Sequence, residues 1–463
     1  MPIVCLGLSH HTAPVDVRER HAFPASRMAE TLIALRDYPT VREAAMLSTC
    51  GRLEIYAEID DYEAGVTQLK AFLMNFRHGA TGYDLESYLY TLLGREAIEH
   101  LFRVSTGLDS MLIGEAEILG QVKDAYIQAH HAKALGTNLH RLFREALNAG
   151  KAARSQTRIG DESTSIATAA VEMAKLRLGT LDGKSVVVIG AGTMGRTVVK
   201  RLRSEGAHDL IVTNRTKARA QELIDEVGFG EAIELPGLTD AIANADIVIT
   251  STGASHFILT PENVAEAMKV RSRHAARQIP PDQITGTENF RPLFIIDIAV
   301  PRDADPQIAE IPYVMLVDID GLRIVVDEKL ELRREAIPHV EEIVAEFVER
   351  FGHWYRSRLA IPVISSLTKK AEALRTEEIA HLFARCPELS DREKMLIAGT
   401  SMKIVSKLLH SVITKIREKA IANHAEAISY ARILDELFEL QLADAIAELV
   451  PHPLSQGTSE KAF

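Results

Sequence analysis

A strand that runs directly into a glycine-rich turn and then into a helix constrains this chain most. Residues 184–189 have a buried-strand pattern, and the turn that follows is Gly190, Ala191, Gly192, Thr193, Met194 and Gly195. In a dinucleotide-binding βαβ unit, the first glycine permits the tight turn, the second lets the backbone approach a pyrophosphate, and the third allows close helix–strand packing. The helix N-terminus then offers free N–H groups to the phosphates. We therefore predict such a unit over residues 183–216.

The residues after the second predicted strand indicate which dinucleotide binds. Sites selective for NAD place Asp or Glu there, because a carboxylate bonds the ribose hydroxyls. This chain instead has Asn214, Arg215 and Thr216. Arg215 can pair with a 2′-phosphate and Thr216 can donate a hydrogen bond to it, whereas a carboxylate would repel it. We predict an NADP(H) site, with NADPH as the cofactor.

Strand and helix patterns alternate around this unit, from about residue 161 to residue 320, which is typical of a parallel doubly wound sheet. The predicted strands are Ser185–Ile189, Asp209–Val212, Asp246–Thr250, Leu293–Ile298 and Val314–Asp318. Predicted helices between them include Thr193–Glu205 and Lys217–Val227. The stretch Arg271–Asn289 is basic and then rich in Pro, Gly and Thr, so we expect a long exposed loop there.

The regions on either side have other patterns. Residues 1 to about 160 mix predicted strands with predicted helices, which suggests an α+β domain. The strands are Ile3–Leu8 and Leu53–Ile59, and the helices are Met28–Arg36, Ala64–Phe76 and Ala97–Val104. From about residue 321 the pattern is helical, at Leu330–Leu359, Ile364–Phe383, Glu393–Val412 and Ser429–Leu449. Pro338 falls inside the first of these, so that helix either kinks or restarts there.

The long apolar stripe of this helical region needs a partner, which a dimer or a packed bundle would supply. The last residues, 451–463, are predicted to form a disordered tail. No run of 18 or more apolar residues appears and the N-terminus does not have the pattern of a secretory signal, so we predict a cytoplasmic protein with no membrane segment. The formal charge of −11 argues against non-specific coating of nucleic acid but leaves room for a local basic face.

The chain has 3 cysteines, Cys5, Cys50 and Cys386, and no CxxC pair, so we predict no metal site. Cys50 lies in a polar stretch with Thr49, Gly51 and Arg52, just before a predicted strand. An arginine there could favour the reactive thiolate or clamp a substrate carboxylate. The alternative is that Cys50 is an inert buried residue.

Two further segments carry candidate polar groups. His100 lies on a predicted helix, where it is either functional or a satisfied half-buried imidazole. The stretch Thr106–Gln121 has three glycines among acidic and apolar residues, and its polar side chains could face one cavity. These side chains are Ser110, Glu115, Glu117 and Gln121.

A basic stripe runs against the acidic balance of the whole chain. It consists of Arg141, Arg144, Lys151, Arg154 and Arg158, which fall along one face of a helix, with Glu145 as the only acid nearby. Such a stripe could hold a phosphate backbone, and the alternative is an ordinary solvated helix face. Our hypothesis is that Arg141, Arg144 and Lys151 hold an RNA.

Taken together, these pieces resemble the glutamyl-tRNA reductase family over nearly the whole chain. The resemblance depends on five separated motifs in the family's order: GLSHHTAPVDVRER, LSTCGRLEIY, GLDSMLIGEAEILGQVKDAY, GAGTMG with VTNRT, and IDIAVPRDADP. It implies a multidomain α/β fold. We expect an N-terminal ferredoxin-like α+β catalytic domain (1–160), a Rossmann NADP domain (161–320), and a long spinal helix with an all-helical dimerisation domain (321–450).

The resemblance also implies the chemistry. Cys50 would attack the ester of glutamyl-tRNA(Glu) to form a thioester, which NADPH would reduce to glutamate-1-semialdehyde in the first step of tetrapyrrole biosynthesis. His100 matches an activity-linked histidine. The glutamyl pocket would include Thr49, Gly51, Arg52, Ser110, Glu115, Ala116, Glu117 and Gln121. A homodimer is implied, and glutamate-1-semialdehyde aminotransferase is a suggested partner. The family usually has Asn at the position of Gly51, so one side-chain contact is in doubt.

Two other functions fit parts of the sequence. One is an NADP-dependent dehydrogenase of a small hydroxy or keto acid, which would need no thiol. The other is a non-catalytic tRNA-binding regulator with a vestigial nucleotide site. NADPH oxidation that depends on charged glutamyl-tRNA would separate both from the reductase. The nucleotide domain and Cys50 belong to different domains, so we also expect a domain movement.

Overall fold

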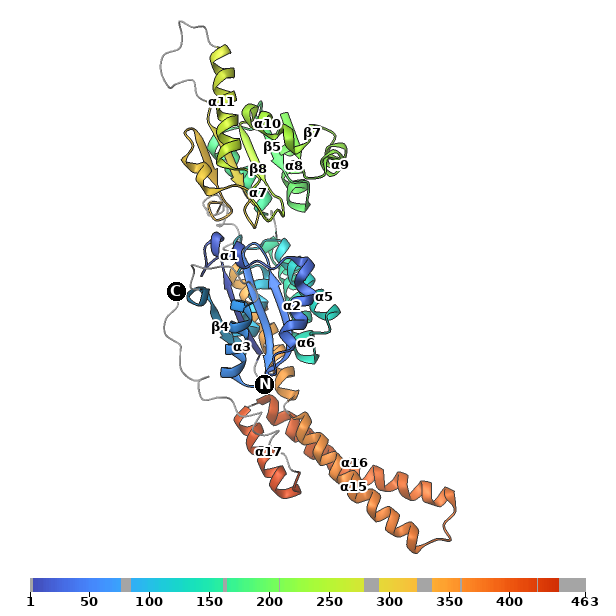
Figure 1. Cartoon of the computed structure of the whole chain (residues 1–463). Helices are drawn as coiled ribbons and strands as arrows, with labels where there is room; N and C mark the ends of the chain where they lie inside the picture. The colour runs from blue at the N-terminus through green and yellow to red at the C-terminus, as the bar shows by residue number, and fades with distance from the viewer. Residues whose placement is uncertain are drawn as a thin grey trace.

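The structure is a computed structural model, and it describes residues 3–75, 85–160, 165–207, 209–278, 291–322, 335–358, 360–422 and 424–440. Figure 1 shows an elongated molecule in which the N-terminal domain lies in the middle. A parallel-sheet domain lies at one end and a helical region projects from the other. The parallel-sheet domain and the projecting helices thus lie on opposite sides of the N-terminal domain.

The N-terminal domain is built on an antiparallel sheet with the strand order β2-β3-β1-β4. Its elements are β1 (Ile3–Ser9), α1 (Val15–His21), α2 (Met28–Arg36), β2 (Val41–Ser48), β3 (Arg52–Ile59), α3 (Tyr62–Asn75) and β4 (Tyr90–Leu93). This order confirms the ferredoxin-like α+β prediction. The helix Met28–Arg36 and the two predicted strands are present, whereas β2 and β4 were not predicted from the sequence.

Three helices, α4 (Arg95–Thr106), α5 (Glu117–His131) and α6 (Thr137–Gln156), complete this domain. The spinal helix α14 (Ile337–Arg358) packs against α4 and α6, and its side chains Val340, Phe347 and Phe351 enter the same core. Pro338 lies in the first turn of α14, where a missing N–H costs nothing. Of the two outcomes considered for Pro338, the helix therefore begins at this point; residues 323–334 lie outside the described part of the chain.

Two buried carboxylates, Glu43 and Glu58, lie opposite each other on neighbouring strands of this sheet. Glu43 on β2 accepts from the N–H groups of Asn138 (3.0 Å) and Leu139 (2.6 Å) at the start of α6. Glu58, opposite it on β3, accepts from the side chain of Asn138. Burial and the neighbouring charge of Glu43 raise the pKa of Glu58 to about 7. Folding therefore favours the protonated form of Glu58.

Glu58→Gln should consequently stabilise the N-terminal domain at alkaline pH. A raised folded-state pKa contributes stability that is complete below the ordinary carboxyl pKa and is lost as the pH rises through 7. Because glutamine stays neutral, the variant should gain about 1–3 kcal/mol at pH 8.5 and almost nothing at about pH 4. Urea unfolding followed through the fluorescence of the single tryptophan, Trp354 on α14, measures this. An equal effect at both pH values would contradict it.

The second domain has a six-stranded parallel sheet with the order β10-β9-β8-β5-β6-β7, as predicted for a doubly wound fold. The strands are β5 (Ser185–Ile189), β6 (Asp209–Thr213), β7 (Glu231–Ile233), β8 (Ile247–Thr250), β9 (Leu293–Asp297) and β10 (Val314–Val317). Helices α7 (Ile166–Leu178), α8 (Thr193–Ser204) and α9 (Lys217–Val227) cover one face. Helices α10 (Leu238–Asn244) and α11 (Pro261–Gln278) cover the other.

The expected exposed loop at Arg271–Asn289 is wrong for its first part, because α11 continues through Gln278. Arg271 is buried, and its guanidinium donates to the backbone carbonyls of Ala243, Ala245, Arg291 and Pro292. A buried guanidinium that donates to four backbone carbonyls holds neighbouring segments together, which an exposed loop residue does not do. Residues 279–290 lie outside the described part of the chain.

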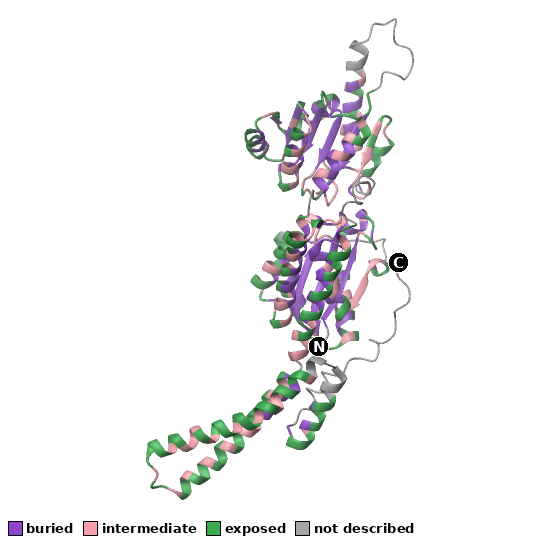
Figure 2. Ribbon diagram, turned by 180° about the vertical axis from the view of Figure 1, so that it is seen from behind, coloured by how far each residue is buried: buried purple, intermediate pink, exposed green. Residues whose placement is uncertain are grey.

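The C-terminal region contains α15 (Ile361–Arg385), α16 (Asp391–Ala422) and α17 (His424–Phe438). Helices α15 and α16 form a long hairpin whose surface is mostly exposed (Figure 2). Its exposed apolar side chains include Met395, Leu396, Ile404 and Leu408. On length and composition alone, Asp391–Lys419 could also cross a membrane, although a single such helix is weak evidence. The predicted tail, 451–463, lies outside the described residues.

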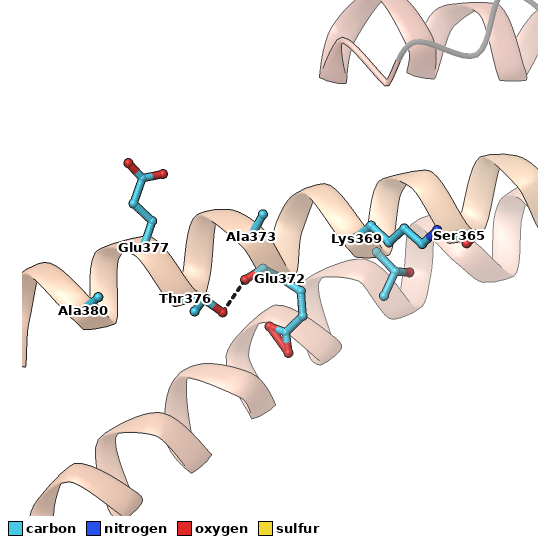
Figure 3. A pocket seen from close by; sticks show the side chains of 8 residues that line it. Ser365, Lys369, Glu372, Ala373, Thr376, Glu377 and Ala380 are labelled. Carbon is cyan, nitrogen blue, oxygen red and sulfur yellow. Dashed lines mark hydrogen bonds between the residues drawn. The ribbon is translucent and has the colours of Figure 1, made fainter.

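A hollow of about 880 Å³ runs along α15 (Figure 3). All of its lining residues come from this one helix, and the hydroxyl of Thr376 donates to the carbonyl of Glu372 within the helix itself. A hollow with a single wall exposes a helix face and does not enclose a ligand. The candidate chemistry lies elsewhere, at the junction between the two sheet domains.

Candidate active site

Cys50 lies in a short, well-braced loop between β2 and β3. The hydroxyl of Thr49 accepts from the N–H groups of Gly51 (3.1 Å) and Arg52 (3.2 Å), and His10 donates its N–H to the carbonyl of Gly51 (2.8 Å). Cys50 itself is half-buried and packs against an apolar cluster that contains Val15 and Leu112 as well as residues of the parallel-sheet domain. The thiol is therefore held rigidly at the junction of the domains.

The surroundings of Cys50 keep the thiol protonated at neutral pH. Burial and the carboxylate of Glu115 raise the pKa of Cys50 to about 12, while Arg18 works in the opposite direction. The sequence suggested that Arg52 could favour the thiolate. In the structure the Arg52 guanidinium is bound to two carboxyl groups, and the cation that lowers the pKa of Cys50 is Arg18.

Arg52 is the centre of a buried polar network. Its Nη1 donates to Glu54 (2.6 Å) and to Asp109 (3.2 Å), and its Nη2 donates to the backbone carbonyl of Asp109. Although burial lowers the pKa of a guanidinium, these carboxylates raise that of Arg52 above its ordinary value. Glu54 also accepts from the hydroxyls of Tyr56 and Tyr90, each at 2.7 Å. Arg52 is thus a fixed cation whose two Nη groups are already bonded.

His100 belongs to this network and not to the loop of Cys50. Its Nε2 lies 2.9 Å from Glu54 and its Nδ1 lies 3.5 Å from Asp109. His11 reaches the other oxygen of Asp109 at 3.0 Å. Burial works to raise the pKa of Asp109, but the bond from His11 and the charge of Arg52 hold it below its ordinary range. The described contacts of His100 therefore orient Glu54, Asp109 and, through them, Arg52.

The glycine-rich stretch before α5 forms a tight loop that brings the acidic candidates to Cys50. Gly107 and Gly114 both have positive φ angles and bond to each other (3.0 Å), and a Cβ at Gly114 would overlap the carbonyl of Ile159. Within the described residues, the buried hydroxyl of Ser110 has no hydrogen-bond partner. Its oxygen is therefore free to bond a substrate.

The acidic residues of this loop have perturbed pKa values. Burial and the neighbouring Glu117 raise the pKa of Glu115 to about 7, and burial raises that of Glu117. Both carboxylates in turn raise the pKa of Cys50. Ala116 is exposed, and Gln121 is half-buried one turn along α5. Carboxyls with raised pKa values beside a thiol are typical of a functional site.

Several residues of this site were not singled out from the sequence. Arg18 lies within the motif GLSHHTAPVDVRER but had no role assigned to it, and neither had Glu54 or Asp109. The available signal was charge: Glu54 alternates with apolar residues on a strand that is buried along its whole length. An acidic residue in such a strand needs a cation close by.

Cys5, Glu54 and His100 place potential metal-binding atoms within 4.8 Å of one another. Glu54 already accepts hydrogen bonds from Arg52, Tyr56, Tyr90 and His100. The Arg52 cation at 2.6 Å would repel a metal ion at that carboxylate. This cluster is therefore explained as a hydrogen-bond network.

The glycine-rich turn after β5 has the form that a pyrophosphate needs. A Cβ at Gly195 would overlap the carbonyl of Gly190, so glycine alone permits this helix–turn contact. A Cβ at Gly192 would meet nothing within 4 Å, so the turn presents open backbone at the start of α8. Thr193 is exposed there, whereas Ala191 is buried and Met194 packs into the apolar cluster beneath. The residues present fit a bound dinucleotide.

The predicted selectivity residues are tied to this turn. Asn214 accepts from the N–H of Ala191 (3.5 Å) and donates to the carbonyl of Thr216 (3.1 Å). Arg215 and Thr216 are exposed at the carboxyl end of β6. After β8, Thr252 donates its N–H to the buried Asp303 (2.7 Å). The two loops therefore flank the glycine-rich turn at one edge of the sheet, where nucleotides bind in such folds.

Helix α1 joins the two sheet domains through charged contacts (Figure 1). Glu19 accepts from the backbone N–H (3.0 Å), Nε (3.0 Å) and Nη2 (2.8 Å) of Arg302. Asp320 accepts from the N–H of Val15 (3.1 Å) and from Nη2 of Arg18 (2.5 Å). The structure thus shows the parallel-sheet domain docked beside the loop of Cys50.

Four residues of the basic stripe lie on α6, Arg158 lies just beyond its end, and the five divide into two groups. Arg144, Lys151 and Arg158 are exposed. Arg141 pairs with the buried Glu145 (2.7 Å), which Arg350 of α14 also contacts (2.7 Å), and Arg154 donates to the backbone carbonyl of Glu115. The exposed group faces solvent, whereas Arg141 and Arg154 also make contacts within the fold.

Comparison with known proteins gives matches along nearly the whole chain. Three family models match: the glutamyl-tRNAGlu reductase N-terminal domain at residues 6–157, shikimate / quinate 5-dehydrogenase at 172–325, and the glutamyl-tRNAGlu reductase dimerisation domain at 339–440. The chain is 36% identical to the glutamyl-tRNA reductase of Bacillus subtilis over 443 residues, which is 96% of this chain and 93% of that protein. Identity to the glutamyl-tRNA reductase of Desulfitobacterium hafniense is 37%, covering 97% and 96%.

A solved structure agrees with these relatives. The glutamyl-tRNA reductase from Methanopyrus kandleri is 30% identical and superimposes with a TM-score of 0.50, covering 95% of this chain and 99% of that chain. The likeness therefore extends over all three parts of the molecule.

Proposed function

This chain belongs to the glutamyl-tRNA reductase family, and we propose that its NADPH-dependent reduction of glutamyl-tRNA(Glu) to glutamate-1-semialdehyde proceeds through a thioester on Cys50. This reaction is the first step of the C5 route to tetrapyrroles. The observation that carries the thioester proposal is the position of Cys50: a braced thiol near Arg18 and Glu115, at the face where the nucleotide domain docks. A dehydrogenase of small hydroxy acids would have no use for this thiol.

The proposed reaction has two stages. In the first, the Cys50 thiol loses its proton, the sulfur bonds to the ester carbonyl carbon, and the bond to the tRNA ribose oxygen breaks as that oxygen gains a proton. When bound, NADPH supplies a hydride, and its transfer to the thioester carbon releases the Cys50 thiolate and the aldehyde. The covalent link keeps the acyl group in place after tRNA has left.

The other predicted site residues have separate roles in this proposal. Ser110, Glu117 and Gln121 face the bound glutamyl group, with Thr49 shaping the loop of the nucleophile and Ala116 starting α5. Arg52 supplies a positive charge for the glutamyl carboxylate that Glu54 and Asp109 partly offset, and His100 keeps Arg52 in place through these two residues. At Gly51, the nearest atoms to an added Cβ are 3.9 Å and 4.0 Å away, so the backbone there has room for the Cβ of the family's usual Asn.

In the nucleotide domain, Gly190 permits the tight turn against Ser251, Gly192 leaves room for the pyrophosphate, and the N–H groups at the start of α8 bind it. Asn214 fixes the selectivity loop so that Arg215 and Thr216 meet the 2′-phosphate. Since Cys50 and this turn lie on different domains, we propose that the domains move relative to each other during the cycle, with the docked arrangement serving hydride transfer.

The decisive experiment is NADPH oxidation with charged glutamyl-tRNA(Glu), compared with uncharged tRNA plus free glutamate and with NADH in place of NADPH. Only charged tRNA with NADPH should give rapid oxidation together with an aldehyde product. Tight tRNA binding without oxidation would favour the regulator alternative. Oxidation of a small hydroxy acid by NADP would favour the dehydrogenase alternative.

Replacing Arg215 should weaken the preference for NADPH. A hydrogen bond to a charged group contributes about 1.5–3 kcal/mol, so Arg215→Gln should raise the KM for NADPH by about 10- to 100-fold and leave the KM for NADH nearly unchanged. Arg177→Gln, at an exposed arginine of α7 outside this loop, is the control. A parallel rise of both KM values would show that the loop was disrupted and would refute the selectivity role.

The exposed part of the basic stripe should bind the tRNA. Arg144→Glu combined with Lys151→Glu should weaken tRNA binding and lower the slope of log affinity against log salt by about 1.5, because each phosphate contact contributes about 0.7–0.9 to that slope. Arg141→Gln should change the slope little, because Arg141 is paired with Glu145. Lys269→Glu, a single charge reversal at an exposed lysine of α11 outside the stripe, is the control. An unchanged slope in the double variant would show that Arg144 and Lys151 do not contact the tRNA phosphates.

The C-terminal helical region is where we expect two subunits to associate. The dimerisation-domain match over residues 339–440 and the exposed apolar side chains of α16 support a homodimer. We further propose a cytoplasmic enzyme whose product passes to glutamate-1-semialdehyde aminotransferase. Size-exclusion chromatography with light scattering tests the dimer, and co-purification of the two enzymes tests the handover.

A further inference from the structure

Arg18 on α1 is a buried cation at the junction of the two sheet domains. Its side chain is 2% exposed, and its Nη2 donates to Asp320 at 2.5 Å. Among the described residues, its Nε and Nη1 have no hydrogen-bond partner. The oxygens of Asp320 are shared between Arg18 and the N–H of Val15. A buried guanidinium with two unused donors keeps a charge that one partly exposed carboxylate offsets only in part.

This cation lies beside the nucleophile. Val15, on the same helix, belongs to the apolar cluster against which Cys50 packs, and the N–H of His10 fastens the segment before α1 to the carbonyl of Gly51. Burial and then Glu115 raise the pKa of Cys50, Arg18 lowers it, and Glu117 raises it further. Arg18 is thus the positive charge that opposes burial and the two carboxylates at the sulfur.

Asp320, which holds Arg18, comes from the other domain. It lies in a turn after β10, 302 residues from Arg18 in the sequence, and follows Ile319 of the apolar cluster beneath the parallel sheet. Any movement of the nucleotide domain away from α1 would break this ion pair. The charge felt by Cys50 would then change although no residue of its own domain had moved.

We propose that Arg18 is a positioning residue that favours the thiolate of Cys50, and that docking of the nucleotide domain weakens this effect because Asp320 engages Arg18. The proposal extends the proposed function, since it takes Cys50 as the nucleophile. With the domains apart, Arg18 is free to favour the attacking thiolate. With the domains docked, as in this structure, Asp320 offsets part of that charge, so a free Cys50 thiol is less reactive than it is with the domains apart.

The test measures the thiol directly, in the full-length enzyme without tRNA, as the pH dependence of Cys50 alkylation by iodoacetamide. Peptide mass spectrometry confirms which cysteine is labelled. Arg18→Gln should move the midpoint to higher pH and slow alkylation at pH 8 by about tenfold, which corresponds to one pKa unit. Arg18→Lys, which keeps the charge, should stay close to wild type. Asp320→Asn should move the midpoint to lower pH and speed alkylation.

Arg302→Gln is the matched control, because it removes the other interdomain ion pair, Glu19–Arg302, and leaves Arg18 and Asp320 in place. Its alkylation midpoint should stay nearer to wild type than that of Asp320→Asn. A folded Arg18→Gln variant with an unchanged midpoint would overturn the proposal, as would equal shifts in Arg18→Gln and Arg18→Lys. An equal effect of Arg302→Gln and Asp320→Asn would overturn the role of Asp320. None of these outcomes depends on turnover, so failure of the thioester mechanism would be seen separately.

Discussion

Cys50→Ser should lower NADPH oxidation with charged glutamyl-tRNA by about a thousandfold or more, and it should do so without loss of folding or cofactor binding. A serine hydroxyl is a poor nucleophile unless a base activates it. The hydrogen bonds described around Cys50 hold the backbone of its loop, and none of them joins the side chain at position 50 to a histidine. The glycine-rich turn lies in the other domain, so NADPH should still bind with its normal affinity.

Three measurements make this prediction specific. Wild-type enzyme given charged tRNA without NADPH should accumulate a glutamyl adduct on Cys50, which acid quenching and mass spectrometry detect, and Cys50→Ser should not. Cys386→Ser, at a half-buried cysteine after α15, is the control and should keep full activity. A Cys50→Ser enzyme that retained the wild-type rate would exclude the thioester mechanism.

The elements that were predicted best from the sequence are those whose side chains are all buried, or all exposed, along the whole element. The strand Ser185–Ile189 is covered on both faces by helices, so an unbroken apolar run gives its bounds. Strand β2 was missed because Glu43 lies near its start, and that charge is buried only because the N-terminus of α6 binds it. Strand β4 is a four-residue edge strand, too short for a pattern to show.

The site shows the same limit. The motifs located Cys50, the polar loop from Ser110 to Gln121 and the nucleotide turn, because each is local in sequence. They could not reveal that Asp320 holds Arg18, or that His100 binds Glu54, since these pairs are joined only by the fold. The direction of the effect on Cys50 also required the structure, because Arg52 is adjacent in sequence while Arg18 is the cation that lowers the pKa of the thiol.

Glu54→Gln should destabilise the N-terminal domain by about 3–5 kcal/mol, the usual cost of removing one partner from a buried ion pair. Arg52 is 2% exposed and Glu54 is fully buried, so neither can turn to solvent when its partner is lost. Glutamine can still accept from Tyr56 or Tyr90, but it leaves Arg52 with Asp109 as its remaining carboxylate partner among the described residues. The same substitution at Glu58 should stabilise the domain, because there the neighbouring charge is the carboxylate of Glu43.

The pH dependence of Glu54→Gln should also be opposite to that of Glu58→Gln. Burial raises the pKa of Glu54, but Arg52 and His100 outweigh it and hold that pKa well below the ordinary value. A lowered folded-state pKa contributes stability that is present above the ordinary carboxyl pKa and is lost as the pH falls. The deficit of Glu54→Gln should therefore be full at pH 7 and should shrink below about pH 4. Urea unfolding followed by Trp354 fluorescence measures both variants side by side, and a Glu54→Gln enzyme as stable as wild type at pH 7 would mean that the ion pair contributes nothing to the fold.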